Sequence, residues 1–232
     1  MLLNNQKIVL VRTGTEESKV ANELRRNGAE VFEFPKWEKV ILPVGEPVVK
    51  RLDSFDKILF TSSEAVTEFF NLVIENSIEL NGHFFGLSLK TLRVLKNYEQ
   101  EGFLAEEMPA AGKLLIVGDQ QIGAEKEQSI LKYGEHELLI TSKKYINQVS
   151  SKIIAEEIME KLPEVLFFPS GKSVHIFAQE AVSYGIDSIA KCPRIVCMGN
   201  NSTEEAKQCG FSPNEMPAVP TVDALLTCLA GR

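Results

Sequence analysis

The chain of 232 residues is long enough for one large domain or two small ones. Hydrophobic residues make up 44% and charged residues 25%, a composition that excludes intrinsic disorder, collagen-like repeats and a disulfide-stapled miniprotein. The net charge of −7 argues against a general nucleic-acid-binding protein and against adsorption to anionic membranes. No apolar run approaches the ~20 residues of a membrane-spanning helix, and the N-terminus shows no signal-peptide pattern.

Short apolar runs alternate with amphipathic stretches along the whole chain. In chain order they predict strand 7–12, helix 16–27, strand 31–34, strand 57–60, helix 64–75, strand 83–87, helix 90–101, strand 113–117, helix 121–133, strand 137–141, helix 151–161, strand 164–168, helix 172–184, strand 194–198, helix 202–209 and helix 221–229. Four helices are expected to end at glycine: Gly28, Gly102, Gly134 and Gly210. This alternation predicts an α/β fold with parallel sheets that carry helices on both faces.

Part of the chain is repeated. Phe60, Ser62, Val66 and Phe69 match Phe168, Ser170, Val174 and Phe177 at a constant offset, and the same offset links Gly102 to Gly210. A slightly shorter offset links strand 7–11 to strand 113–117, and Gly28 to Gly134. Against chance similarity among apolar strands, these matches favour one α/β unit present twice, and therefore two similar domains. Segments 36–43 and 142–149 follow equivalent strands, and we expect both to be extended connections between the lobes.

The cysteines and histidines show no metal-binding or disulfide pattern. The four cysteines are Cys192, Cys197, Cys209 and Cys228, which contain no CxxC pair and are expected to be reduced thiols in a cytoplasmic protein. The three histidines, His83, His136 and His175, lack ligand spacing, so no metal site is expected.

Polar residues cluster where predicted strands lead into helices, which is where open parallel sheets bind ligands. These clusters are Arg12-Thr13, Thr61-Ser62-Ser63, Ser88 to Thr91, Gly118-Asp119, Ser170-Gly171-Lys172-Ser173, and Gly199-Asn200-Asn201-Ser202. Such residues are also ordinary helix N-caps, and each cluster taken alone is explained by capping. Together they describe sites with hydroxyl and amide donors and inward-pointing helix dipoles, which suit carboxylates or phosphates.

Common catalytic signatures are missing. No GxGxxG follows the first strand, and no GxSxG is present. Ser170 to Ser173 is similar to the end of a P-loop, but Leu166 stands where its first glycine should be. We therefore expect an enzyme of this kind to work by positioning its substrate rather than through a nucleophile.

The chain resembles the uroporphyrinogen-III synthase family over nearly its whole length. The matching segments are Val11-Arg12, Gly28 to Val31 with Pro35, Asp56 to Ser62 with Ala65-Val66, Ser88 to Thr91 with Leu95, Phe167 to Gly171, Met198 to Ser202 with Gly210, and Pro220 to Leu226. The resemblance implies two similar flavodoxin-like lobes with parallel sheets, joined by a two-stranded linker. The lobes would be residues 1–36 with 148–232, and residues 44–141, with connecting strands 37–43 and 142–147.

The function that the resemblance implies is the cyclisation of hydroxymethylbilane to uroporphyrinogen III, with inversion of the terminal pyrrole ring and loss of water. The enzyme would need no cofactor. It would bind the substrate in the cleft between the lobes, act as a cytoplasmic monomer, receive its substrate from hydroxymethylbilane synthase, and bind neither nucleic acid nor membrane. Because the substrate carries eight carboxylates and the protein is itself negative, binding depends on local donors. The expected substrate-binding residues are Arg12, Thr61, Ser62, Ser63, Ser88, Thr91, Ser170, Gly171, Lys172, Gly199, Asn200, Asn201 and Ser202.

Some positions depart from the family pattern. A tyrosine that the family favours as the acid aligns with Lys143, and Tyr145 stands two residues later, on the same face of a strand. Either side chain could supply the proton, or Tyr145 only packs in the connection. Ser88 replaces a glycine, and Pro169 replaces a threonine and removes a donor.

Two alternatives remain open. The first is a noncatalytic two-lobed module that binds another anionic ligand, and the changes at Lys143 and Pro169 are compatible with it as well as with a divergent enzyme. The second is a flavodoxin-like enzyme with a phosphate-bearing cofactor, which would show a bound flavin or nucleotide.

Overall fold

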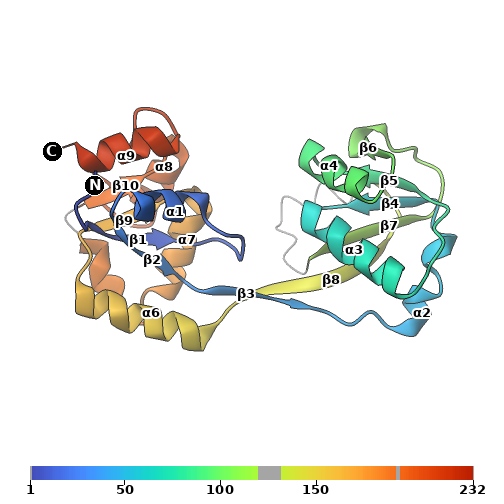
Figure 1. The fold of residues 1–232 in the computed structure, drawn as a ribbon, viewed down its shortest axis with the longest axis horizontal. Coiled ribbons are helices and arrows are strands. Elements are labelled where there is room, and N and C mark those ends of the chain that lie inside the picture. The colour runs from blue at the N-terminus through green and yellow to red at the C-terminus, as the bar shows by residue number, and fades with distance from the viewer. Residues whose placement is uncertain (1, 120–131, 192–193, 232) are drawn as a thin grey trace. The chain divides into compact units, whose positions relative to one another are not determined.

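The computed structural model describes residues 2–119, 132–191 and 194–231, and the chain divides into two compact units (Figure 1). Unit 1 comprises Met1–Glu38 and Tyr145–Arg232, and unit 2 comprises Lys39–Lys144. The four clusters of buried apolar side chains each lie wholly within one unit. Each unit is therefore described by itself.

Unit 1 contains a four-stranded parallel sheet in the order β10-β9-β1-β2. Its strands are β1 (Lys7–Val11), β2 (Glu30–Phe34), β9 (Val165–Phe168) and β10 (Arg194–Cys197). Alternate residues of β1 face opposite sides, with Ile8 and Leu10 in one buried cluster and Val9 and Val11 in the other. Both faces of this sheet are therefore buried, as its continuous apolar strands predict.

Helices cover both faces of the sheet in unit 1. Those in the described part of the unit are α1 (Lys19–Arg26), α6 (Gln148–Lys161), α7 (Gly171–Glu180), η3 (Asp187–Lys191), α8 (Asn200–Gln208) and α9 (Val222–Ala230). The buried side chains of α6, α7 and α8 join the cluster on one face of the sheet, and those of α1 and α9 join the cluster on the other. This arrangement is the one predicted from the sequence.

Unit 2 is built on a six-stranded sheet in the order β3-β8-β7-β4-β5-β6. The strands are β3 (Trp37–Ile41), β4 (Lys57–Phe60), β5 (His83–Gly86), β6 (Gly102–Leu104), β7 (Leu114–Asp119) and β8 (Glu137–Ile146). The five strands from β4 to β8 pair in parallel. One face packs against α3 (Ser63–Glu75) and α4 (Leu89–Asn97); the other packs against Ala105 of η2 (Ala105–Glu107) and Tyr133. Two short helices, α2 (Glu46–Val49) and η1 (Leu52–Ser54), precede β4.

Strands β3 and β8 each continue across the boundary between the units. Asn147 N–H donates to the Lys36 carbonyl at 2.8 Å, and Leu42 N–H donates to the Thr141 carbonyl at 2.9 Å. The two residue numbers in each pair have the same sum, which is the register of an antiparallel pair. The predicted strand 137–141 and the connection after it are therefore one continuous strand, β8.

Several predicted boundaries were wrong. Helix α1 begins at Lys19 instead of residue 16, because the Ser18 hydroxyl accepts the Ala21 N–H and caps the helix there. Helix α7 ends at Glu180, although its apolar pattern extends to 184. The predicted helix 121–133 falls mostly on residues 120–131, which lie outside the described residues.

Gly102 does not cap a helix. Helix α4 ends at Asn97, the left-handed residue after it is Glu99 with φ of 58°, and Gly102 begins β6. A Cβ at Gly102 would lie 2.6 Å from Leu95 Cδ1, so glycine is required here by the close packing of α4 on β6. Gly28 and Gly210 follow α1 and α8 with φ of 93° and 83°, as predicted for C-terminal caps.

Candidate functional site

In unit 1, two neighbouring strands lead into helices whose N-termini lie at the same edge of the sheet. Ser170 follows β9 and caps α7, accepting the Ser173 N–H at 3.3 Å. Gly199 follows β10 and caps α8 through its backbone. A Cβ on Gly171 would lie 2.9 Å from Glu205 Cγ and 3.1 Å from Asn201 Nδ2, so the glycine lets the first turns of α7 and α8 pack closely. The structure therefore brings the predicted residues of these two segments together.

The same arrangement recurs in unit 2 at the ends of the neighbouring strands β4 and β5. Ser62 caps α3, and its hydroxyl accepts the Ala65 N–H at 3.1 Å. Ser88 caps α4, and its hydroxyl accepts the Thr91 N–H at 3.3 Å. Thr61 is buried and donates to the Val117 carbonyl at 3.2 Å, while Ser63 is half-buried as the first residue of α3.

Two predicted hydroxyl residues occupy equivalent positions, three residues after a cap. Thr91 is 1% exposed, and its Oγ1 lies 3.0 Å from Ser88 Oγ. Ser202 is 3% exposed; its Oγ accepts the Gly199 N–H at 3.2 Å and donates to the Gly199 carbonyl at 2.9 Å. Both hydroxyls thus stabilise the first turn of their helix. The neighbouring residues Ser88, Asn200 and Asn201 are exposed to solvent.

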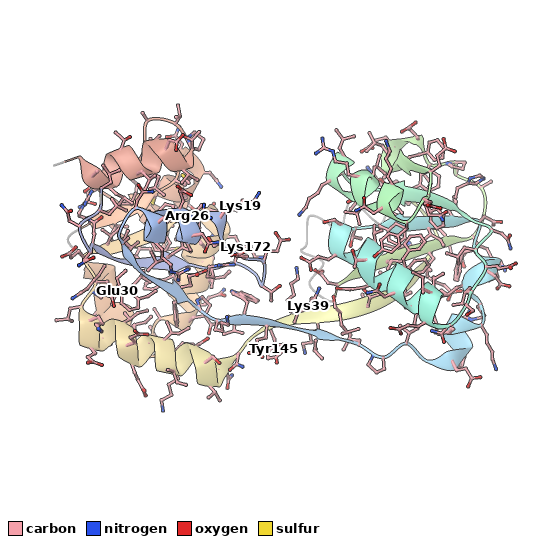
Figure 2. All side chains as sticks on the ribbon, in the orientation of Figure 1. Lys19, Arg26, Glu30, Lys39, Tyr145 and Lys172 are labelled. Atoms are coloured by element: carbon pink, nitrogen blue, oxygen red, sulfur yellow. The ribbon has the colours of Figure 1, made fainter. Side chains whose placement is uncertain are left out.

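Three helices, α1, α4 and α7, have a lysine in their first turn. Lys172 is the second residue of α7 and Lys19 is the first residue of α1, and both are exposed (Figure 2). Lys90, the second residue of α4, is exposed as well. None of α1, α4, α7 and α8 carries an acidic residue in its first turn. A cation there opposes the helix dipole, so these helix starts carry a positive potential that an anion would neutralise. Lys172 was predicted from the sequence as a binding residue. Lys19 and Lys90 were not, although they lie within two residues of the serine caps of their helices.

Arg12 follows β1 and is engaged within unit 1. Its guanidinium forms an ion pair with Glu33, which also pairs with Arg25 at 2.8 Å, and it donates to the backbone carbonyls of Gly14 and Glu16. The Arg12 side chain is 15% exposed and lines a pocket of about 460 Å³ that also includes Arg25 and Trp37. Arg12 therefore fixes the loop between β1 and α1.

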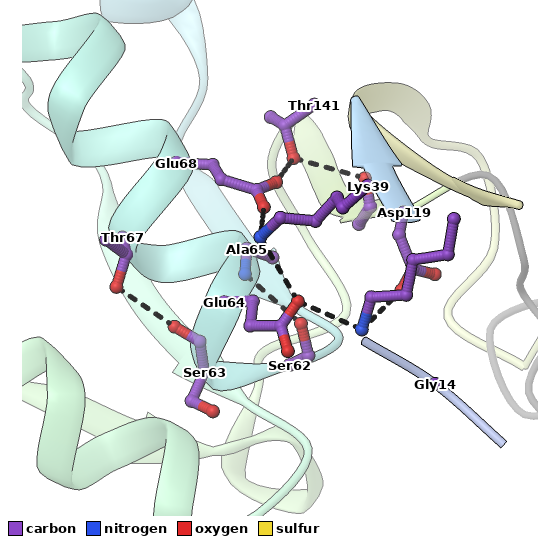
Figure 3. Close-up of polar contacts among 12 residues, drawn as sticks. Gly14, Lys39, Ser62, Ser63, Glu64, Ala65, Thr67, Glu68, Asp119 and Thr141 are labelled. Atoms are coloured by element: carbon purple, nitrogen blue, oxygen red, sulfur yellow. Dashed lines mark hydrogen bonds and ion pairs between the residues drawn. The ribbon is translucent and has the colours of Figure 1, made fainter. Parts of the chain in front are cut away.

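A charged network surrounds the first turns of α3 (Figure 3). Lys39 Nζ lies 2.7 Å from Glu68 Oε1 and 3.3 Å from Glu64 Oε2, and Lys144 Nζ lies 2.9 Å from Glu64 Oε2. Thr141 donates to Glu68 at 2.5 Å. Burial lowers the pKa of Lys39, but the hydrogen bond and charge of Glu68, together with Glu64, outweigh it, so the pKa is raised. The network ties β3 and β8 to α3 and was not found from the sequence, because its members are far apart in the chain.

The two candidate proton donors, Lys143 and Tyr145, lie on β8. A β-bulge follows Gly118 in the pairing of β7 with β8, and beyond it Lys143 and Tyr145 are both exposed, while Lys144 is half-buried. Tyr145 donates to Glu38 Oε2 at 2.9 Å. This hydrogen bond, and then the charge of Glu38, raises the pKa of Tyr145 above 10. The two residues share a face of the strand, as predicted.

Comparisons with known proteins identify the fold. A mutant uroporphyrinogen III synthase from the extremely thermophilic bacterium Thermus thermophilus superposes with a TM-score of 0.63 at 12% identity, covering 96% of both chains. The uroporphyrinogen-III synthetase of Helicobacter pylori superposes with a TM-score of 0.58 at 15% identity, covering 95% of this chain and 96% of that one. This chain has the uroporphyrinogen-III synthase fold. The resemblance drawn from the sequence is thereby confirmed for the fold.

Sequence comparisons find two proteins whose names refer to uroporphyrinogen III or to porphyrin biosynthesis. The uroporphyrinogen-III C-methyltransferase of Bacillus subtilis (strain 168) is 28% identical over 203 residues, which are 86% of this chain and 41% of that protein. The porphyrin biosynthesis protein HemD of Ruminiclostridium josui is 23% identical over 226 residues, 87% of this chain and 44% of that protein. The chain spans less than half the length of both relatives. No family model matches the sequence.

Within this uroporphyrinogen-III synthase fold, the predicted substrate-binding residues gather at the carboxyl ends of strands in both units. Arg12, Ser170 to Lys172 and Gly199 to Ser202 lie in unit 1, and Thr61 to Ser63, Ser88 and Thr91 lie in unit 2. Among the described residues, no group of histidines, cysteines and carboxylates is arranged to hold a metal ion. Nor does the described part of the chain contain a helix of the length and apolarity needed to cross a membrane.

Proposed function

We propose that the protein is a uroporphyrinogen-III synthase, which cyclises hydroxymethylbilane to uroporphyrinogen III with inversion of the terminal pyrrole ring and loss of water. The observation that carries the proposal is a fold match to enzymes of that name over 96% of the chain. The names of the two sequence relatives, both in porphyrin metabolism, support the same assignment.

The helix starts support the binding of a polycarboxylate. Hydroxymethylbilane carries eight carboxylates, and a protein with a net charge of −7 repels it at long range. Four helix N-termini without acidic residues, three of them with lysine, provide local positive potential and backbone N–H groups. In this proposal Ser88, Ser170 and Asn200 add hydrogen-bond donors there, and Lys172 adds charge. Ser62 and Ser63 add donors at the start of α3, whose first turn also carries Glu64.

The proposed reaction requires that the enzyme position the bilane and supply one proton. An unconstrained bilane closes without inverting its last ring, so the catalyst has to hold the chain with the substituted carbon at the site of attack. The departing hydroxyl needs a proton. Lys143 and Tyr145 are the proposed donors. A tyrosine carries its proton at neutral pH, and the contact with Glu38 raises the pKa of Tyr145 further.

The organisation proposed for this activity is two flavodoxin-like lobes, residues 1–36 with 148–232 and residues 44–141, joined by strands 37–43 and 142–147. The strand order β2-β1-β9-β10 in unit 1 supports the flavodoxin-like description. The proposed enzyme is a cofactor-free cytoplasmic monomer that takes its substrate from hydroxymethylbilane synthase.

The test is an isomer analysis. Hydroxymethylbilane generated enzymatically is incubated with the purified protein, the products are oxidised, and the type I and type III isomers are separated. We expect type III to dominate, whereas the same mixture without the protein gives type I. Type I alone would refute the assignment. Tight binding of the bilane together with type I product would instead indicate the noncatalytic module.

A further inference from the structure

A cysteine, a histidine and a glutamate form a chain of contacts on the outer side of α7 and α8. His175 Nε2 lies 2.8 Å from Glu205 Oε2, and Cys209 Sγ lies 3.6 Å from His175 Nδ1. The His175 side chain is 52% exposed, and Cys209 is half-buried. A small molecule in solvent can therefore reach this group.

The two helices build this row of contacts from two i,i+4 pairs. Gly171 and His175 lie one turn apart on α7. Glu205 lies on α8, and Cys209, four residues later, is the C-cap of that helix. Because Gly171 has no Cβ, Glu205 packs against the start of α7 and comes within reach of His175. The carboxylate is thus held by packing as well as by its hydrogen bond.

The contacts also assign the imidazole tautomer. An ionised carboxylate only accepts hydrogen bonds, so the Nε2 that faces Glu205 carries the proton. In the neutral ring, Nδ1 is then an acceptor and faces the Cys209 thiol. This is the order of groups found in nucleophilic thiols: a thiol, a base, and a third group that orients the base.

We propose that Cys209 is a modification site for hydroperoxides, with His175 as the base and Glu205 as the positioning residue. When the thiol attacks hydrogen peroxide, an S–O bond forms and the O–O bond breaks. The thiol proton passes to His175 Nδ1 and then to the departing hydroxide, which leaves as water. Sulfur is oxidised by two electrons to a sulfenic acid, and the peroxide is reduced.

The other described cysteines provide internal references. Cys197 is buried, and burial raises the pKa of its thiol. Burial also raises the pKa of Cys228, as does the charge of Glu215. Neither has a histidine partner among the described contacts. Within one folded chain, Cys209 should therefore react fastest of these three.

The experiment follows sulfenic acid formation on each cysteine separately. The full chain is reduced, exposed to dilute hydrogen peroxide at neutral pH with dimedone as a trap, digested, and analysed by peptide mass spectrometry. We expect the adduct on Cys209 to form at least about 10-fold faster than that on Cys228, and His175→Ala to lower the Cys209 rate by a similar factor. His136→Ala is the matched control and should leave the rate unchanged.

A base role is separated from a structural one by chemical rescue. Added imidazole should restore much of the Cys209 rate in His175→Ala and leave the unmodified protein unaffected. Protection of Cys197 in each variant reports that the fold is intact; where it is lost, Glu205→Gln takes the place of the histidine variant and should slow Cys209. Equal rates at Cys209 and Cys228, an unchanged rate in His175→Ala, or no rescue by imidazole would overturn the proposal.

Discussion

Tyr145 and Asn147 both donate a hydrogen bond to the carboxylate of Glu38. Tyr145 Oη donates to Glu38 Oε2 at 2.9 Å, and Asn147 Nδ2 donates to Glu38 Oε1 at 2.7 Å. Glu38 is thus held at both oxygens, and its charge faces the phenol. A phenol in this position loses its proton with more difficulty than one in water.

The first prediction is the titration of Tyr145. Because its pKa is raised in the folded state, the contact with Glu38 is fully stabilising below pH about 10 and is lost as the pH rises through the higher folded value. Subtracting the alkaline ultraviolet titration of Tyr145→Phe from that of the unmodified protein isolates this phenolate. Glu38→Gln should move its midpoint down toward 10, and an unmoved midpoint would mean that Glu38 does not set it.

The second prediction concerns the proton supplied in the proposed reaction. Tyr145→Phe should slow formation of the type III isomer by about 10-fold, because Tyr145 is one donor among several and not a nucleophile. Tyr184→Phe is the matched control: Tyr184 packs edge-on against Phe34 in unit 1 and should keep the full rate. If the type III rate is the same in both variants, Tyr145 has no part in the chemistry.

At the scale of one element, the charged network around the start of α3 stabilises the fold, and this stabilisation decreases at high pH. The pKa of Lys39 is raised above 10.5, so its ion pairs stabilise the fold fully below that pH and are lost as the pH rises through the higher folded value. Lys39→Met should lower the free energy of unfolding by about 1 kcal/mol at pH 8 and by progressively less at higher pH. Lys50→Met is the control.

The control removes an exposed i,i+4 pair between Lys50 and Glu46, whose side chains are 70% and 77% exposed. Such a pair contributes at most about 0.5 kcal/mol. Urea unfolding followed by circular dichroism measures both variants. An effect of Lys39→Met no larger than that of Lys50→Met would show that the network adds nothing beyond ordinary surface pairing.

The first turn of α7 provides the fourth prediction. Lys172→Gln removes a cation that opposes the helix dipole, so the free energy of unfolding should rise or stay unchanged, by a few tenths of a kcal/mol at most. In the proposed reaction KM for the bilane should rise several-fold. Lys207→Gln makes the same charge change in the last turn of α8 and should leave KM unchanged. A KM that changes equally in both variants would point to overall charge instead.

Much of the fold could be predicted because it depends on local patterns. Strand β4 has the predicted bounds, Lys57–Phe60, and serine caps fix the starts of α3, α4 and α7. The predicted glycine caps were right at Gly28 and Gly210, where φ is positive. Gly134 also has a positive φ, of 78°, but most of the helix predicted before it lies outside the described residues. Gly102 was wrongly predicted as a helix cap. In the sequence, a glycine that ends a helix cannot be distinguished from a glycine in a strand that lets a helix pack closely against it.

The rest could not be predicted because it depends on contacts between distant residues. Strand β6 has three residues, too few to show a period, and forms by pairing with β5. The ion pair of Arg12 with Glu33 forms because the parallel pairing of β1 with β2 brings the two residues together, and no local pattern marks it. The candidate helix starts were found, since capping residues mark them. Lys19 and Lys90, in the first turns of two of these helices, were not predicted because no sequence motif marks them.

At the scale of the whole molecule, the internal repeat explains the order of both sheets. The repeat equates β1 with β7, β2 with β8, β9 with β4, and β10 with β5. In unit 1 the strands lie in the order β2-β1-β9-β10, and in unit 2 the equivalent strands lie in the order β8-β7-β4-β5. The order is the same, although unit 1 is assembled from two separate stretches of chain and unit 2 from one.

Because unit 2 is continuous in sequence, it can be tested alone. Its two buried clusters draw on residues 52–139, and its central strands β4 and β7 pair with each other inside the fragment. We expect residues 39–144 to fold as a separate chain with a single cooperative thermal transition by circular dichroism. Residues 39–104 are the control, since they lack β7 and β8 and leave one side of β4 unpaired. Loss of cooperative unfolding in the longer fragment would show that unit 2 depends on unit 1 for its stability.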